Sequence, residues 1–247
     1  MSHIWVPRAY YRYTHSIMKG KHMSNPNPAP QKGTHIYKLV DRSGSMESIA
    51  SDVIGGFNHF LREQQANGDD ARITVVQFDS QNPAEVIAAG IPIREMTEMT
   101  PQTFIPRGGT PLLDATGSII SRARAEAEAR KAANLPEEDI IIVTITDGEE
   151  NQSVEYSLQQ VRDLIGVCES AGWVFVYLSA ALDAYGDAQR MGVHSGATQQ
   201  FSHSADGSRR GFTSLSRNMV NLREKKRRGE YYDSSTFFET GKDAEDE

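Results

Sequence analysis

The sequence is poor in cysteine and has no long apolar run. Its single cysteine, Cys168, cannot form a disulfide within the chain, and this favours a reducing compartment such as the cytoplasm. No segment approaches the roughly 20 apolar residues that a membrane-spanning helix needs. Residues 1–23 also lack the sustained apolar core of a secretory signal. We therefore expect a cytoplasmic protein that makes no membrane contact.

Basic residues are outnumbered by acidic ones. The 247 residues include 26 Lys and Arg but 33 Asp and Glu, which gives a formal net charge of −7. An acidic surface repels the phosphate backbone, so we do not expect nucleic acid as a partner. The basic run "REKKRR" (Arg223–Arg228) leaves a nucleic-acid contact open as an alternative. Cations at the end of a helix are stabilising by themselves, however, and no aromatic residues interleave this run.

A lack of periodicity marks both ends of the chain. Residues 1–34 show neither helical nor strand spacing, and "NPNPAP" (Asn25–Pro30) resists regular structure, which predicts a flexible N-terminal extension. Residues 229–247 are polar and end in "KDAEDE", which predicts a disordered acidic C-terminal tail. Residues 35–228 are predicted to form one domain, because a hydrophobic content of 38% is sufficient for a packed core.

Between these ends, strand-like runs alternate with helical periodicity. "HIYKLV" (His35–Val40) has the length of a strand, whereas Met46–Gln65 places apolar residues at spacings of three and four, as an amphipathic helix does. The continuous apolar run that begins at Glu138 is typical of a strand covered on both faces. Further strands are expected over Ala71–Ser80, Gly172–Ala180 and Ala197–His203, and further helices up to Asn134 and over Val154–Ala171, Leu182–Met191 and Ser208–Arg227.

The run Glu85–Ile93 is predicted to be an edge strand. Only a short Asn-Pro turn separates it from the preceding strand, and so short a connection permits only an antiparallel pair. Pro92 cannot donate a hydrogen bond to a neighbouring strand, which places the run at the edge. The alternation of strands and helices elsewhere indicates a parallel sheet. The predicted fold is α/β and doubly wound, a mostly parallel six-stranded sheet with an antiparallel edge strand and helices on both faces.

Oxygen-bearing side chains gather in three loops at strand ends or helix starts. "DRSGSM" follows the first strand and places Asp41, Ser43 and Ser45 at alternate positions. "GGT" (Gly108–Thr110) precedes the long helix, and "TDG" places Asp147 after the buried strand. Ligand sites in open α/β sheets lie beyond the carboxyl ends of the strands. We therefore expect the three loops to form one site.

In their order and chemistry, these motifs resemble the von Willebrand factor A (vWA) domain, which has a Rossmann-like fold. The family has a metal-ion-dependent adhesion site built from Asp-x-Ser-x-Ser, a threonine and an aspartate. The resemblance covers roughly residues 36–220. The metal-holding residues that it implies are Asp41, Ser43, Ser45, Thr110 and Asp147. It also implies that the three hydroxyls bind the cation directly and that the two aspartates act through water or hydrogen bonds.

Hydroxyl and carboxylate oxygens, without histidine or cysteine, suit a hard cation. Mg²⁺ is the first candidate and Mn²⁺ the second. By resemblance, the cation takes one ligand from outside the chain, a glutamate or aspartate of a partner protein. Stand-alone microbial or phage-type members of the family work inside larger assemblies, including some that contain ATPases. The expected function is divalent-metal-dependent protein binding, of the adhesion or scaffold type.

Catalysis is the main alternative. A Mg²⁺-dependent hydrolase or phosphatase-like enzyme could place an acid at the end of the first strand, but it needs a second acid two residues later, where Ser43 stands. A serine hydrolase needs a base for its nucleophile, and no histidine lies in the three loops. We therefore expect no enzyme activity. A simpler alternative is that Asp41 and Ser43 only cap the following helix, but this leaves Thr110 and Asp147 unexplained.

Other polar residues near the site have structural explanations beside functional ones. Arg42 and Arg107, in the site loops, either attract an acidic partner or are solvated. Residues 149–151 either border the site or favour a helix start. The alternating charges of Arg122–Lys131 predict a solvated helix face, and Cys168 is expected to be a buried filler of the core rather than a nucleophile.

Overall fold

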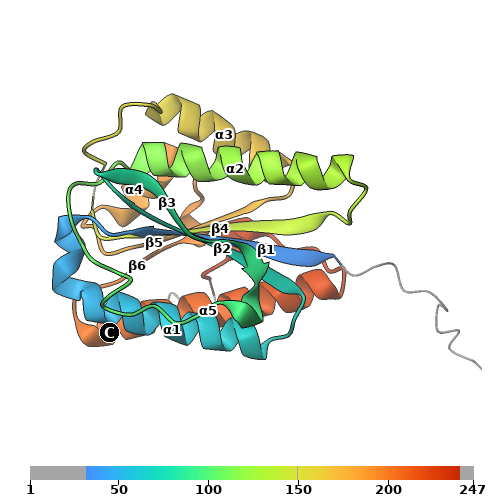
Figure 1. The fold of residues 1–247 in the computed structure, drawn as a ribbon, viewed down its shortest axis with the longest axis horizontal. Coiled ribbons are helices and arrows are strands. Elements are labelled where there is room, and N and C mark those ends of the chain that lie inside the picture. The colour runs from blue at the N-terminus through green and yellow to red at the C-terminus, as the bar shows by residue number, and fades with distance from the viewer. Residues whose placement is uncertain (1–31, 149, 240–247) are drawn as a thin grey trace, which may run out of the picture. The chain divides into compact units, whose positions relative to one another are not determined.

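A six-stranded sheet forms the centre of the computed structural model, which describes residues 32–148 and 150–239 (Figure 1). Its strands are β1 Gly33–Asp41, β2 Ala71–Asp79, β3 Asn82–Pro92, β4 Glu138–Thr146, β5 Val174–Ser179 and β6 Thr198–Gln200. The strand order is β3-β2-β1-β4-β5-β6. All neighbours pair in parallel except β3, which is antiparallel to β2. The predicted fold class is therefore confirmed.

Helices cover both faces of the sheet. α1 (Ala50–Ala66) and α5 (Ala205–Arg227) pack together on one face, and α2 (Leu112–Ala132) and α3 (Leu158–Ser170) lie on the other (Figure 1). α4 (Ala184–Met191) packs against α3 and β6. The 3₁₀ helices of the described residues are η1 Gly44–Ile49, η2 Ile93–Glu95, η3 Ser195–Ala197 and η4 Ser234–Thr236. Among the described helices, none has the length and apolar character needed to cross a bilayer.

The winding direction of the sheet reverses between β1 and β4. From β1 the chain moves outward to β2 and β3, then returns to β4 on the other side of β1 and continues to β5 and β6. The register pairs Val40 with Ile145, so the carboxyl ends of the two strands lie side by side. In sheets of this kind, ligands bind outside the carboxyl ends of the strands at the reversal.

The central strand contains a buried cation. Lys38 of β1 is fully buried, and its Nζ lies 3.6 Å from the ring centroid of Phe60 and 4.8 Å from that of Phe57. Nζ has no hydrogen-bond partner among the described residues. Burial holds the pKa of Lys38 well below its usual range. The length of the run predicted the strand. The sequence did not predict that the lysine side chain points into the apolar layer beneath α1.

The antiparallel edge strand is confirmed, with an earlier start than predicted. β3 begins at Asn82, which pairs with Asp79 across a tight hairpin, and it ends at Pro92, which pairs with Arg72. The Asn-Pro dipeptide is therefore the start of the strand rather than a turn before it.

Two helices begin later than predicted. Met46 lies in η1, and the α-helix begins only at Ala50. The helix predicted from Val154 begins at Leu158, because Ser157 and Gln160 form a capping box in which each side chain accepts a hydrogen bond from the other's backbone N–H. The residues before it belong to a loop that borders the candidate site.

The predicted domain boundaries need correction at both ends. β1 begins at Gly33, so the domain starts two residues before 35. Disorder was predicted for 229–247, but Phe237 and Phe238 are 1% and 0% exposed, and the Phe238 N–H donates to the Gly196 carbonyl at 2.7 Å. The prediction is wrong for 229–239 because two adjacent aromatic side chains outweigh the polar residues around them. Residues 1–31 and 240–247 lie outside the described residues.

Candidate functional site

Asp41 anchors the first loop of the site. It is fully buried at the end of β1, where its Oδ1 accepts the Ser43 N–H at 2.7 Å and its Oδ2 accepts the Thr146 hydroxyl at 2.6 Å. Thr146 is the last residue of β4. One carboxylate therefore fixes the loop after β1 and ties it to the end of the neighbouring strand.

The hydroxyls of the first loop continue this chain of contacts to the third loop. The Oγ atoms of Ser43 and Ser45 are 3.0 Å apart, and Ser45 Oγ donates to Asp147 Oδ1 at 2.8 Å. Ser45 and Asp147 are far apart in the sequence but meet here because β1 and β4 end side by side. Four of the five predicted residues thus lie in one continuous hydrogen-bonded set.

Thr110 reaches the same place from the second loop. A Cβ at Gly148 would lie 3.4 Å from Thr110 Oγ1 and 3.6 Å from Ser45 Oγ, so both hydroxyls lie close to Gly148. Thr110 N donates to Asn151 Oδ1 at 2.9 Å, and Asn151 N donates back to the Thr110 carbonyl at 3.1 Å. The structure therefore brings all three predicted loops together.

The two glycines before Thr110 allow this approach. Gly108 has a φ of +67°, a conformation that side chains disfavour, and its carbonyl accepts the Gly44 N–H at 3.0 Å. A Cβ at Gly109 would lie 2.7 Å from Cδ of Gln152 in the third loop. The motif "GGT" is thus needed for the second loop to pass between the other two.

The two carboxyl groups of the site lie in an environment that disfavours their charge. Burial raises the pKa of Asp41 to about 6, although the hydrogen bonds from Thr146 and Ser43 oppose the shift. Burial also raises the pKa of Asp147, against the hydrogen bond from Ser45. Asp147 Oδ2 is buried and has no hydrogen-bond partner among the described residues. A nearby positive charge would stabilise both ionised carboxylates.

An ion-pair cluster that the sequence analysis missed supports the first two loops. Arg42 is 5% exposed, and its Nε donates to Asp79 Oδ2 at 2.6 Å. Arg107 Nε donates to the same oxygen at 3.0 Å, and its backbone N–H donates to the Arg42 carbonyl at 2.7 Å. Arg42 is therefore a buried structural residue, neither solvated nor free to attract a partner. The sequence signal that could have revealed this cluster was Asp79, a third aspartate at the end of a predicted strand.

A second missed residue ties the third loop to α2. Asp114 accepts hydrogen bonds from the backbone N–H groups of Val154, Glu155 and Tyr156 at 2.8 to 2.9 Å. Glu150, which was expected to border the site or start a helix, instead accepts the Leu113 N–H at 2.8 Å and three donors within its own loop. Glu149 lies outside the described residues.

His203 lies near the site although it is remote in sequence. Its charge would lower the pKa of Asp147, and its Nε2 is 3.1 Å from the Ala180 carbonyl oxygen. Ala180 directly follows β5, so this contact comes from the same edge of the sheet. No periodicity or motif connects His203 to the three loops.

The basic run Arg223–Arg228 is largely occupied by contacts within the protein. Arg223 is fully buried and binds Asp70 through Nη2 at 2.7 Å. Lys226 pairs with Asp139 at 3.3 Å, and Arg228 Nε pairs with Glu230 at 2.5 Å. These contacts account for most of the run structurally and weaken the nucleic-acid alternative.

The donor set of the site fits a hard divalent cation. In the part of the chain that the structure describes, no group of three or more His, Cys, Asp or Glu side chains could hold a metal ion. Cation binding would therefore rest on hydroxyls backed by carboxylates, as at this site. The unpaired Asp147 oxygen and the hydroxyls of Ser45 and Thr110 close to Gly148 are consistent with that chemistry.

No protein-family model and no curated protein sequence matches the chain. Among solved structures, the pilus adhesin SpaC from Lactobacillus rhamnosus GG is similar at 15% identity and a TM-score of 0.57, over 77% of this chain and 31% of that chain. The TFIIH p34 N-terminal domain is 12% identical with a TM-score of 0.51, over 75% of this chain and 97% of that chain.

A vWA domain, that of SpRpn10, is also among the matching structures. It is 12% identical with a TM-score of 0.49, over 74% of this chain and 94% of that chain. At such identities the likeness concerns the fold alone. SpaC and the TFIIH p34 domain, whose TM-scores exceed 0.5, share the α/β fold of this chain, and the vWA type rests on the resemblance of the three loop motifs.

Proposed function

We propose that this chain is a metal-dependent protein-binding domain of the vWA type. The observation that carries the proposal is the convergence of three loops, with the hydroxyls of Ser45 and Thr110 both close to Gly148 and an unpaired, buried oxygen on Asp147. A packed protein rarely leaves a buried carboxylate oxygen without a partner, because the loss of its hydration is costly.

The residues present fit Mg²⁺ first and Mn²⁺ second. Ser43, Ser45 and Thr110 would hold the ion through their hydroxyls, and Asp41 and Asp147 would offset its charge while orienting those hydroxyls. When bound, the ion would supply a positive charge that a carboxylate of another protein can neutralise. The partner in this proposal is therefore a protein that presents an exposed glutamate or aspartate.

The domain acts in this proposal by binding rather than by catalysis. Ser43 hydrogen-bonds Ser45, which donates to Asp147, and no described residue of the three loops is a histidine that could activate either serine. The cytoplasm is the proposed location, since a single buried cysteine suits a reducing compartment. An ATPase-containing assembly is one setting for such a partner, which the resemblance to the family suggests.

A capture experiment with matched variants tests the proposal. The protein should retain its partner in Mg²⁺, lose it in a metal chelator, and regain it when Mg²⁺ or Mn²⁺ is restored. Thr110→Ala should abolish capture. Thr97→Ala, which removes an exposed hydroxyl from the same segment between η2 and α2, should not. Replacement of the partner's contacting Glu by Gln should have the same effect as the chelator. A complex that survives both the chelator and Thr110→Ala would contradict a metal-bridged contact.

A further inference from the structure

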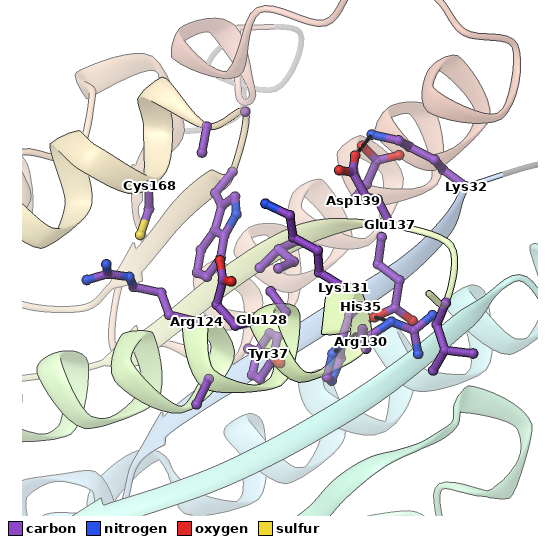
Figure 2. Close-up of a pocket in the computed structure, with 18 of the residues that line it drawn as sticks. Lys32, His35, Tyr37, Arg124, Glu128, Arg130, Lys131, Glu137, Asp139 and Cys168 are labelled. Carbon is purple, nitrogen blue, oxygen red and sulfur yellow. Dashed lines mark ion pairs between the residues drawn. The ribbon is translucent and has the colours of Figure 1, made fainter. Parts of the chain in front are cut away.

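A recess of about 770 Å³ lies at the amino-terminal edge of the sheet, opposite the candidate metal site (Figure 2). Lys32 precedes β1, Glu138 begins β4 and Trp173 precedes β5, and all three line it. The other walls come from the second half of α2 and the end of α3. The parallel strands all start at this edge, whereas the loops of the candidate metal site lie where β1 and β4 end. The recess therefore shares no residue with the three loops that contain Asp41, Thr110 and Asp147.

The recess carries an excess of positive charge in a protein whose formal net charge is −7. Its lining includes six basic and four acidic side chains. Four of the basic residues are held by three of the acidic ones in ion pairs of 2.7 to 3.3 Å. These pairs are Lys32 with Glu137, Arg72 and Arg130 with Glu138, and Lys226 with Asp139.

Two cations of the lining form no ion pair with the described residues. Within the described part of the chain, Arg124 and Lys131 have no carboxylate partner, and the remaining acid, Glu128, has no cationic one. These three residues lie at positions i, i+7 and i+4 of α2, so they share one face of the helix. Figure 2 shows them extending from α2 on the side that faces Cys168 of α3. The helix dipole accounts for a cation in the last turn, such as Lys131, but not for Arg124 two turns earlier.

An unsatisfied polar atom lies buried behind the lining of the recess. His35 is fully buried, and its Nε2 is 2.8 Å from Thr74 Oγ1. Its Nδ1 has no hydrogen-bond partner among the described residues, and the nearest carboxylate oxygens, on Glu126 and Glu138, are 3.8 and 3.9 Å away. Burial and the charges of Arg72, Arg130 and Arg122 lower the pKa of His35 to about 2, so the ring is neutral. The ring therefore adds no charge to the recess, and its Nδ1 has too little accessible surface for a ligand to contact it.

Apolar groups complete the lining. Trp173 is partly buried, and Val167 and Leu135 are 58% and 49% exposed at the recess. The volume lies within the range of about 300–1,000 Å³ that is usual for small-molecule sites. An indole and two aliphatic side chains favour a flat apolar body, whereas Arg124 and Lys131 favour an anion.

We infer that this recess binds a small molecule in which a planar ring system carries an anionic group, the chemistry of a mononucleotide. The anionic group lies against Arg124 and Lys131, and the ring packs on Trp173. This site is independent of the proposed metal-dependent function, because no residue of one contributes to the other.

Titration of the full chain with AMP, adenosine and inorganic phosphate, without added metal, tests the inference. Two-dimensional NMR of the backbone amides reports where each compound binds. AMP should shift the amide signals of Ala171, Gly172 and Lys131 in a saturable way, and it should bind at least about tenfold more tightly than adenosine or phosphate alone, because only AMP combines ring and anion. The absence of saturable shifts at these residues, or equal binding of AMP and adenosine, would overturn the inference.

Charge variants on one face of α2 give effects of opposite sign. Arg124→Gln and Lys131→Gln should each weaken AMP binding about fivefold, whereas Glu128→Gln should strengthen it by a similar factor. Arg217→Gln removes an exposed cation on α5, on the other face of the sheet, and should change nothing. All four positions are exposed, so circular dichroism should show an unchanged fold. AMP affinity that is the same in Arg124→Gln, Glu128→Gln and Arg217→Gln would contradict the assignment.

Discussion

The two edges of the sheet use different kinds of polar side chain. At the carboxyl edge the side chains that converge on the candidate site are short: Ser43 contacts Ser45 at 3.0 Å, and Ser45 contacts Asp147 at 2.8 Å. At the amino edge they are long, and residues such as Arg72 and Glu138 form ion pairs of 2.7 to 2.8 Å across strands and helices.

This difference matters for what each edge can bind. Short side chains have few rotamers to lose, so loops that are fixed by backbone hydrogen bonds hold their oxygens ready for a small, hard ion. Arginine and lysine have several rotatable bonds and carry their charge at the end of a flexible stem, so they adjust to larger anions at an entropic cost. The comparison predicts that substitutions among the converging hydroxyls and carboxylates of the three loops change cation affinity, whereas substitutions in buried ion pairs, at either edge, change stability.

The largest effect is expected from Arg223→Met, which removes a buried cation near the amino edge. It would leave the carbonyls of Gln64 and Gly68 and the carboxylate of Asp70 without their donor. Breaking such a buried pair should lower the free energy of unfolding by about 3–5 kcal/mol. Urea unfolding measures the loss. The matched substitution Arg217→Met, at an exposed position of α5, should leave the midpoint almost unchanged, and equal midpoints for the two variants would show that Arg223 is dispensable.

A smaller and pH-dependent loss is expected from Asp79→Asn. Burial raises the pKa of Asp79, but hydrogen bonds from Arg42, Gln81 and Arg107 outweigh it and hold the pKa below 3.8. The stabilisation from the ionised group is therefore present above about pH 4 and is lost as the pH falls through the lower folded-state value. The variant should be about 1.5–3 kcal/mol less stable at pH 7. The stability gap between variant and wild type should narrow as the pH falls below about 4, and a gap that stays constant from about pH 7 to pH 3 would contradict this origin.

Next in size is the effect of Asp41→Asn on cation binding. The change keeps the shape of the side chain but removes the charge behind Ser43 and Thr146. Affinity for Mn²⁺ should fall about 10- to 100-fold, as for other residues that orient metal ligands. Calorimetric titration gives the affinity, and Asp163→Asn, at an exposed position of α3, serves as the control. Unchanged Mn²⁺ affinity in Asp41→Asn would exclude Asp41 from the site.

The smallest effect is expected from Asn151→Ala, which frees the backbone of Thr110. Asn151 contacts Thr110 through its Oδ1, so it acts by positioning. The expected loss of Mn²⁺ affinity is about fivefold, the order of one neutral hydrogen bond. Asn151→Asp retains an acceptor at the same place and should restore the affinity. Failure of this rescue would show that the side chain matters for another reason.

The fold and the meeting of the three loops could be inferred from sequence because their signals are local. Strand-length runs, helical spacing and the motifs around Asp41, Thr110 and Asp147 each lie within a few neighbouring positions. The convergence of the loops follows from the rule that parallel strands end at one edge. The metal itself stays a prediction.

What the sequence could not show depends on contacts between distant segments. The structural role of Asp114 depends on three backbone N–H groups some 40 residues away in sequence. The buried ion pair of Arg223 likewise depends on the distant Asp70. Phe237 and Phe238 were hidden in a polar stretch, where composition argues for disorder although two side chains are buried. Such features follow only once the sheet order and the helix packing are known.

The most direct test of the account is calorimetric titration of Mg²⁺ into the wild type, Ser45→Ala and Ser48→Ala. Ser45 Oγ lies between Ser43 and Asp147, whereas Ser48 is an exposed hydroxyl one turn later in the same 3₁₀ helix. The account predicts one binding site in the wild type, retained in Ser48→Ala and weakened at least about tenfold in Ser45→Ala, with the fold intact in all three. Equal Mg²⁺ binding by the two variants, or none by the wild type, would contradict it.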